Sequence, residues 1–239
     1  MIKTIKKIIA VGCCLCLSFQ VSAQRNWSNL ENDVKTAVNV DTINKSKFTL
    51  VFINKSQDFD PKLQEKLIGV FFTNYPKQVK KYNKEAIRKV VFVIDPAYKG
   101  VAAAAAGVIR FNPEWFKKNP GDIDVVTHET MHLVQNYPNN AGPGWITEGI
   151  ADFVRYDMGI DNKGANWRLP DFSQTHSYEN AYRITARFFA WIEKNRKKGF
   201  VKKLDAAMRN RQYSEEFWKE NTGLNLDELW AEYAKNPQI

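Results

Sequence analysis

The sequence predicts an α+β fold, with strands in the first half of the chain and helices in the second. The runs that favour strands all end by residue 111, and from Asp122 onwards apolar residues recur at helical spacing. No internal repeat and no linker rich in proline, glycine or serine divides the 239 residues. With 44% apolar and 26% charged residues, the composition excludes a collagen, a coiled-coil rod and a disordered chain. The order of elements therefore indicates a single α+β domain rather than an alternating α/β fold.

In the first half, residues 48–54 and 89–95 favour strands because they are rich in β-branched and aromatic side chains. Residues 61–80 carry apolar residues at helical spacing, and we expect Pro76 to end or kink that helix. Residues 102–111 are ambiguous, because five alanines favour a helix whereas Gly107 and the following Val-Ile-Arg-Phe favour a strand. We predict a strand over residues 105–111.

In the second half, Asp122 is a candidate N-cap for a helix whose apolar positions continue to Val134. Residues 138–144 predict a loop, residues 145–158 a helix, and residues 159–177 a long loop. The remaining helices are expected at residues 178–195, 199–210, 214–221 and 225–234.

Residues 1–23 have the pattern of a secretory signal peptide. Three lysines and no acid precede an apolar run of 12 residues, and Val21-Ser22-Ala23 offers small residues for cleavage. This predicts a secreted or periplasmic protein with no membrane anchor after cleavage. A buried N-terminal helix and a lipoprotein attached through Cys13 remain as alternatives. The rest, residues 24–239, forms the predicted domain, with residues 24–45 as an N-terminal extension that could be flexible.

The three cysteines, Cys13, Cys14 and Cys16, all lie within the predicted signal peptide. The exported chain would therefore hold no disulfide, no cysteine zinc finger and no redox pair. Removal of residues 1–23 would lower the formal net charge from +9 to +6. Such a modest charge, spread among acidic residues, argues against nucleic acid as a partner. Basic residues gather in residues 194–203, where we expect a solvated face; attraction to acidic polysaccharide is the alternative.

The strongest chemical signal is His-Glu-Thr-Met-His at residues 128–132. On a helix, residues four apart share a face, so both His128 and His132 can reach one metal ion. Glu129 lies about 100° around the helix and can reach a water beside that ion. Two nitrogen ligands, an open coordination position and a carboxylate base are the requirements of a catalytic zinc site.

A third zinc ligand is expected from Trp-Ile-Thr-Glu-Gly-Ile-Ala-Asp at residues 145–152. The intervening loop can turn the chain back, so that Glu148 faces the histidines, and Gly149 would let the helices approach closely. Asp152 lies one turn further on and can accept a hydrogen bond from the second ring nitrogen of a ligand histidine.

These motifs resemble those of the gluzincin metallopeptidases and, more closely, those of the basic secretory protein (BSP) family, peptidases of plants and bacteria. The resemblance rests on HETMHLVQ, EGIADFVRY, AYRITARFFAWIE, GFVKKLDAAMRN and LDELWAEY. It implies a zincin-like fold, with a small mixed sheet packed on the HExxH helix and a mostly helical C-terminal half. It also implies Zn²⁺ bound by His128, His132 and Glu148. His176 lies outside these motifs and is read as a loop histidine.

The expected function is a secreted zinc endopeptidase in which a zinc-activated water attacks the peptide bond and Glu129 is the general base. Tyr182 and Tyr156 are candidate donors to the oxyanion, and either could instead be a packed surface aromatic. The strand at 105–111 could pair with an extended peptide or be an ordinary packed strand. Two other functions remain open: a non-catalytic binding protein on the same fold, and a zinc hydrolase of cell-wall amide bonds. A peptide or protein is the expected partner, and a monomer the expected state.

Overall fold

A computed structural model describes residues 29–239, and the predicted signal peptide lies outside the described residues. Five strands form one sheet: β1 (Asn39–Lys45), β2 (Phe48–Asn54), β3 (Lys89–Ile94), β4 (Ala102–Ala105) and β5 (Val108–Phe111). The helices before the long loop are α2 (Leu30–Lys35), α3 (Pro61–Lys81), α4 (Pro113–Lys118), α5 (Val125–Gln135) and α6 (Gly144–Met158). After it come η1 (Tyr178–Asn180), α7 (Tyr182–Asn195), α8 (Phe200–Arg209), α9 (Glu216–Thr222) and α10 (Leu226–Lys235). The α+β prediction is confirmed.

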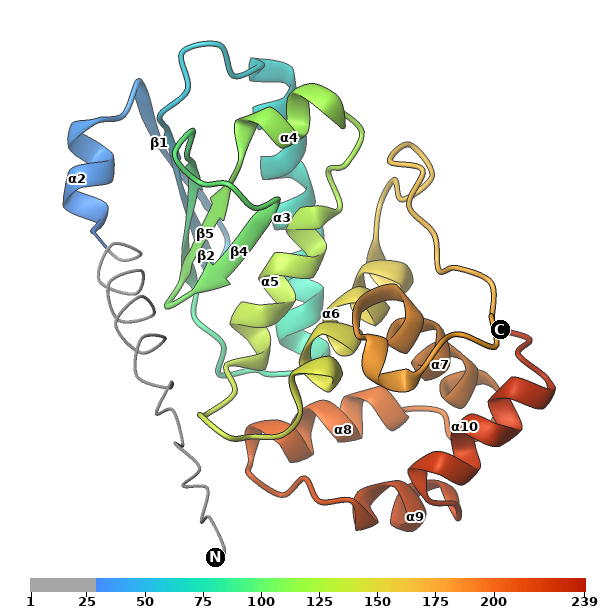
Figure 1. The fold of residues 1–239 in the computed structure, drawn as a ribbon. Coiled ribbons are helices and arrows are strands. Elements are labelled where there is room, and N and C mark those ends of the chain that lie inside the picture. The colour runs from blue at the N-terminus through green and yellow to red at the C-terminus, as the bar shows by residue number, and fades with distance from the viewer. Residues whose placement is uncertain (1–28) are drawn as a thin grey trace, which may run out of the picture.

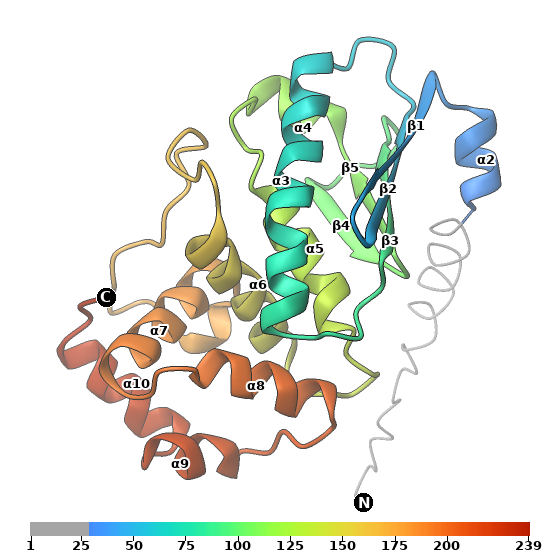
Figure 2. The same cartoon turned by 180° about the vertical axis from the view of Figure 1, so that it is seen from behind.

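The sheet is mixed, with the strand order β1-β2-β3-β5-β4. The central strands β2, β3 and β5 are parallel, while β1 and β4 are antiparallel edge strands. Side chains alternate between the faces, so that Val90, Phe92 and Ile94 join the main core, whereas Val91 and Val93 face a smaller cluster. Helices α3 and α5 cover the first face and α2 lies on the other side of the sheet (Figures 1 and 2).

The treatment of residues 24–45 as an extension is wrong for the part that the structure describes. Residues 30–45 form α2 and β1, and β1 pairs along its whole length with β2. The buried Asp33 of α2 forms ion pairs with Arg110 of β5 and with Lys55, and Arg110 also pairs with Asp95. A buried carboxylate that is paired in this way holds α2 against the sheet, a contact that no local sequence pattern reveals.

Residues 102–111 form a hairpin rather than one strand from residue 105. Ala106 and Gly107 both have positive φ angles, 49° and 83°, and they make the tight turn between β4 and β5. Gly107 therefore serves the turn and does not lie along the strand. Edge strand β4, built of four alanines, contacts the HExxH helix α5.

Two helix boundaries also differ from expectation. Helix α3 continues through Pro76 to Lys81 without ending there. The N-cap residue of α5 is Asp124, not Asp122, and the buried Asp124 carboxylate accepts hydrogen bonds from the Thr127 hydroxyl and from the backbone N–H groups of residues 160 and 161. Asp122 faces the cleft described below.

The C-terminal half is helical, as predicted, and its helices lie beside α6 and below the sheet in Figure 1. The predicted helix at 178–195 is interrupted at Ala181, which separates η1 from α7. Aromatic side chains from α6 to α10, such as Trp145, Phe188 and Trp218, form the core of this half. Within residues 29–239, no helix combines the length and hydropathy needed to cross a bilayer.

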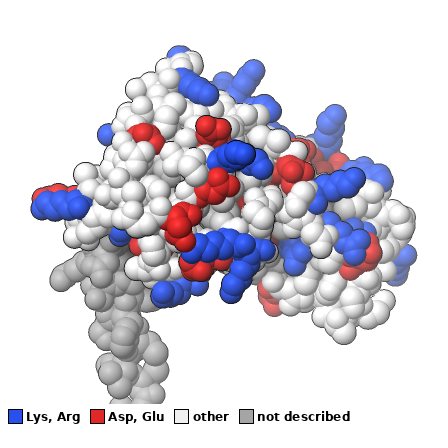
Figure 3. All heavy atoms as spheres, turned by 90° about the horizontal axis from the view of Figure 1, so that it is seen from above, with Lys and Arg blue, Asp and Glu red and all other residues white. Residues whose placement is uncertain are grey.

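Charged side chains of both signs are interspersed on the face seen from above (Figure 3). The basic side chains of the α7–α8 junction are exposed to solvent: Lys194, Arg196, Lys197, Lys198, Lys202 and Lys203. Arg196 among them forms an ion pair with Glu232 of α10. The junction thus has the exposure expected of a solvated face.

Candidate metal centre and active-site cleft

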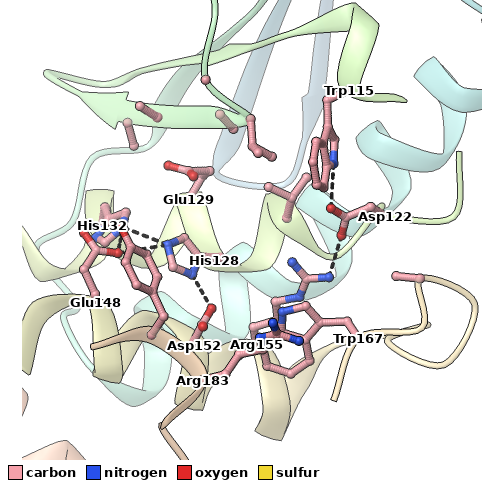
Figure 4. A pocket seen from close by; sticks show the side chains of 18 of the residues that line it. Trp115, Asp122, His128, Glu129, His132, Glu148, Asp152, Arg155, Trp167 and Arg183 are labelled. Atoms are coloured by element: carbon pink, nitrogen blue, oxygen red, sulfur yellow. Dashed lines mark hydrogen bonds and ion pairs between the residues drawn. The ribbon is translucent and has the colours of Figure 1, made fainter. Parts of the chain in front are cut away.

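A cleft of about 1070 Å³ lies between edge strand β4 and helices α5, α6 and α7. Two helix faces line it with side chains at regular intervals. On α5, His128, His132 and Gln135 follow one another at helical spacing, and on α6 the same holds for Glu148, Asp152 and Arg155. Figure 4 shows His128, His132, Glu148 and Asp152 close together, with Arg155 further along α6.

Three ligand atoms converge at the centre of the cleft. His128 Nε2 lies 3.1 Å from His132 Nε2 and 3.3 Å from Glu148 Oε2, and His132 Nε2 lies 3.5 Å from the same oxygen. Glu148, predicted to face the histidines, does so from α6. These three residues form the one group of potential metal ligands found in the described part of the chain.

The ring orientation of both histidines is set by their other nitrogens. His128 Nδ1–H donates to Asp152 Oδ1 at 2.7 Å, as the spacing predicted. His132 Nδ1–H donates to the side-chain oxygen of Gln135, also at 2.7 Å. With Nδ1 as the donor in each ring, the Nε2 atom of the neutral imidazole is free to act as a ligand, and the two Nε2 atoms lie close to one another and to Glu148 Oε2. Either a proton or a metal ion between the three atoms would satisfy this arrangement.

The ligand triangle fits zinc. Tetrahedral zinc with bonds of about 2.0–2.1 Å places its ligand atoms about 3.3 Å apart, and the observed separations of 3.1, 3.3 and 3.5 Å bracket that value. Two imidazoles and one carboxylate are also a donor set typical of catalytic zinc. The residues present therefore fit a zinc ion with room for one more ligand on the cleft side.

The surrounding charges favour a cation at this centre. Burial lowers the pKa of His128, but hydrogen bonds with Asp152 and Glu148 outweigh burial and raise that pKa to about 10. Burial raises the pKa of Glu148, yet its interactions with His128 and His132 bring that pKa below its usual value. The two acidic residues thus stabilise positive charge between the histidines.

Glu129 lines the same cleft but does not join the ligand triangle. Its side chain is 5% exposed, and its buried Oε2 has no hydrogen-bond partner among the described residues. Burial raises the pKa of this carboxyl group, and the nearby histidines partly oppose that effect. A buried carboxylate without a partner is costly, so its position beside the ligands suggests a role in chemistry rather than in folding.

Two further contacts fix the register of α5 against α6. At one end, Arg155 forms an ion pair with Asp122 at 2.5 Å. At the other end, the amide nitrogen of Gln135 donates to the backbone oxygen of Thr147 at 2.9 Å, next to Glu148. Gln135 therefore both orients His132 and positions the helix of the third ligand. The sequence analysis missed this residue, although it lies seven positions after His128 on the same helix face.

Gly149 allows a close approach, but not to the helix that we predicted. A Cβ at this position would lie 2.3 Å from Thr185 Cγ2, so the glycine lets α7, rather than α5, pack closely against α6. The Thr185 hydroxyl also donates to the backbone oxygen of Tyr178. This packing brings the N-terminus of α7 to the edge of the metal centre.

Of the two candidate tyrosines, the structure brings only Tyr182 to the cleft. Its ring stacks near His128, with 6.3 Å between ring centroids, and its side chain is 54% exposed. The charge of Glu148, followed by burial, raises the pKa of Tyr182, so its hydroxyl keeps a proton that it can donate. Tyr156 lies on α6 and is 45% exposed, but it does not line the cleft.

The other predicted features are also placed. His176 lies in the long loop, where its Nδ1 accepts a hydrogen bond from the Ser173 N–H. The strand that borders the cleft is β4, not the predicted 105–111, because the hairpin turn puts β5 inside the sheet. Tyr98, whose hydroxyl donates to the Ala102 oxygen, also lines the cleft and was not predicted.

Comparisons with known proteins identify a family and a similar fold. Residues 32–233 match the family BSP, described as a peptidase of plants and bacteria. No curated protein matches the sequence. The fold is similar to that of a two-domain M1 zinc metallopeptidase, whose crystal structure is that of a mutant bound to L-tryptophan. The TM-score is 0.51 and the sequence identity is 12%, and the match covers 84% of this chain and 52% of that chain. An M1 zinc metallopeptidase from Deinococcus radiodurans gives a TM-score of 0.50 and 12% identity over 85% of this chain and 51% of that chain. This chain thus spans about half the length of these structures, and the likeness is one of fold.

Proposed function

Because this chain belongs to the BSP family of peptidases of plants and bacteria, as its motifs predicted, we propose that it is a zinc-dependent endopeptidase. One observation carries the proposal: a triangle of two imidazole nitrogens and one carboxylate oxygen lies beside a buried carboxylate that has no partner. The fold likeness to zinc metallopeptidases supports the choice of zinc.

In this proposal His128, His132 and Glu148 hold the zinc ion, and Asp152 and Gln135 orient the two imidazoles. A bound zinc would polarise the scissile carbonyl and lower the pKa of a water from 15.7 to about 7. Glu129 then takes the proton of the attacking water and passes it to the leaving nitrogen. Its unpartnered Oε2 is the atom that accepts this proton.

Two other parts of the cleft serve the substrate. The alanines of β4 present an edge with small side chains, where an extended peptide can add as a further strand and lie across the centre. The Tyr182 hydroxyl is the candidate donor to the oxyanion that forms on the attacked carbonyl. Its exposed ring can turn towards a bound peptide without unpacking the core.

Replacing Gln135 with alanine should weaken zinc binding by about 10- to 100-fold. The change removes the hydrogen bond that orients His132 and the hydrogen bond to the backbone of α6 at Thr147, next to Glu148. The affinity can be measured by competition with a chromophoric chelator. Gln135→Glu is the matched comparison, since its carboxylate can still accept from His132 Nδ1, and it should bind zinc better than the alanine variant. Equal zinc affinity in all three proteins would contradict the positioning role of Gln135.

The experiment that tests the proposed function combines metal analysis with peptide cleavage. The purified protein should contain about one zinc per chain, cleave internal bonds in a diverse peptide library, lose activity with a chelator and regain it with zinc. Stoichiometric zinc without any cleavage would instead favour a binding protein. Cleavage of cell-wall amides but not of peptides would favour a zinc hydrolase of cell-wall amide bonds.

The charged, apolar and small residues of 1–23 support export of the enzyme.

A further inference from the structure

The cleft extends beyond the metal ligands along one face of α6. Glu148, Asp152 and Arg155 occupy successive turns of that face, and all three line the cleft. With a rise of 1.5 Å per residue, Arg155 lies about 10 Å along the helix from Glu148. An extended peptide covers that distance with about three residues. This arm of the cleft is therefore long enough to bind substrate residues beside the cleaved bond.

The strand direction indicates which substrate residues would lie there. The backbone oxygen of Val101, just before β4, accepts from the Asn112 N–H, and Asn112 caps α4. From α4, Trp115 Nε1 donates to Asp122, the ion-pair partner of Arg155. Strand β4 thus begins at the Arg155 end of the cleft. A peptide that pairs with β4 in the more stable antiparallel arrangement runs in the opposite direction. The residues that follow its cleaved bond then lie at the Arg155 end of the cleft.

Two arginines line the cleft, and within residues 29–239 the side chain of only one of them has a partner. Arg155 is buried, pairs with Asp122, donates to Asn162 and stacks on Trp167 with 4.5 Å from its guanidinium carbon to the ring centroid. Arg183 is exposed, and its side chain makes no hydrogen bond, ion pair or ring contact with any residue of the described range 29–239. In Figure 4 its side chain extends towards the part of the cleft that holds Arg155 and Trp167.

The backbone that carries Arg183 is nevertheless firmly held. Arg183 is the second residue of α7 and follows Ala181 and Tyr182, which have positive φ angles of 60° and 49°. Non-glycine residues adopt such angles at a cost, which the surrounding packing must offset. The close packing of α7 on Gly149 supplies that support. A fixed backbone with a free guanidinium is suited to binding a ligand.

From these observations we propose that Arg183 binds a carboxylate carried by the part of the peptide that follows the cleaved bond. The proposal rests on the peptidase function above. A guanidinium forms two parallel hydrogen bonds with a carboxylate, which makes it selective for that group. The carboxylate could be an acidic side chain or the C-terminal carboxylate of a short substrate. Both sources share this chemistry, and the experiment separates them.

The test uses three peptides that differ only after the cleaved bond. One has neutral side chains and an amidated end, one has an acidic residue two or three positions after the bond and an amidated end, and one is neutral with a free C-terminus there. The native enzyme should cleave at least one carboxylate-bearing peptide with a kcat/KM at least tenfold above that of the neutral peptide. The preferred peptide identifies the source of the carboxylate.

Arg183→Gln should reduce kcat/KM for that preferred peptide by about 10- to 100-fold, mostly through KM, which is the range for a hydrogen bond to a charged group. Cleavage of the neutral peptide and zinc content should stay unchanged. Arg183→Lys should restore part of the preference because it keeps the charge. Arg168→Gln, a change of an exposed arginine that does not line the cleft, is the control and should have no effect.

The proposal is overturned if the native enzyme and Arg183→Gln share the same preference, or if the variant loses activity equally on all three peptides. Binding of the uncleaved peptides to zinc-loaded Glu129→Gln, with and without Arg183→Gln, measures the same selectivity by calorimetry without catalysis. Charge-selective binding without cleavage by the native protein would contradict the peptidase function and leave the role of Arg183 standing. Cleavage without any carboxylate preference would contradict the role of Arg183 alone.

Discussion

Replacing Glu129 with glutamine should reduce kcat for peptide hydrolysis by about 100- to 10,000-fold, the contribution typical of a general base. Glutamine has nearly the same shape but cannot take a proton from the attacking water. Because Glu129 Oε2 has no partner among residues 29–239, the change breaks no hydrogen bond at that atom. Zinc content and thermal stability should therefore match those of the native protein, while kcat falls.

The control for this experiment is Glu220→Gln, which removes the same charge from an exposed position on α9. Its kcat, zinc content and melting temperature should equal those of the native protein. If Glu129→Gln retained native activity with a full complement of zinc, another group would have to be the base. Loss of zinc in this variant would instead show that Glu129 helps to hold the metal centre together.

Replacing Glu148 with glutamine should abolish activity for a different reason, because it removes a ligand atom. Residues that only orient a ligand already contribute about 10- to 100-fold to metal affinity, so the loss here should exceed about 100-fold. At a zinc concentration about 100 times the native Kd, zinc stabilises the native protein by about 2.7 kcal/mol, and this variant loses nearly all of that gain. For a chain of this length that corresponds to a fall in Tm of roughly 5–10 °C when zinc is present.

Differential scanning calorimetry with and without zinc measures this effect directly. Zinc should raise the Tm of the native protein and of Glu220→Gln, and should have little effect on Glu148→Gln. The contrast with Glu129→Gln is informative, because that variant should respond to zinc while being inactive. Native zinc affinity in Glu148→Gln would mean that the triangle of ligand atoms is not the metal site.

Several elements could be predicted because one local pattern specifies them. Strands β2 and β3 and the helices from α6 onwards follow from apolar periodicity, and the structure confirms them. Strand β1 was missed because it is an exposed edge whose side chains show no buried alternation. The β4–β5 hairpin was missed because it depends on a tight turn at Ala106, a residue type that rarely adopts positive φ.

Some residues of the candidate site could likewise be predicted from local patterns, whereas others depend on tertiary packing. His128 and His132 needed only the helical repeat to share a face, and the loop between the two helices, together with the resemblance to a known family, indicated Glu148. Which tyrosine reaches the cleft, which helix packs on Gly149, and which arginine is left unpaired all depend on how α6 and α7 pack together. Those contacts join residues 30 or more positions apart, and their energies come from burial and hydrogen bonds formed only in the folded chain. Local spacing therefore predicted the candidate metal ligands and Asp152, whereas tertiary packing decided that Gln135 holds His132 and which residues of α7 line the cleft.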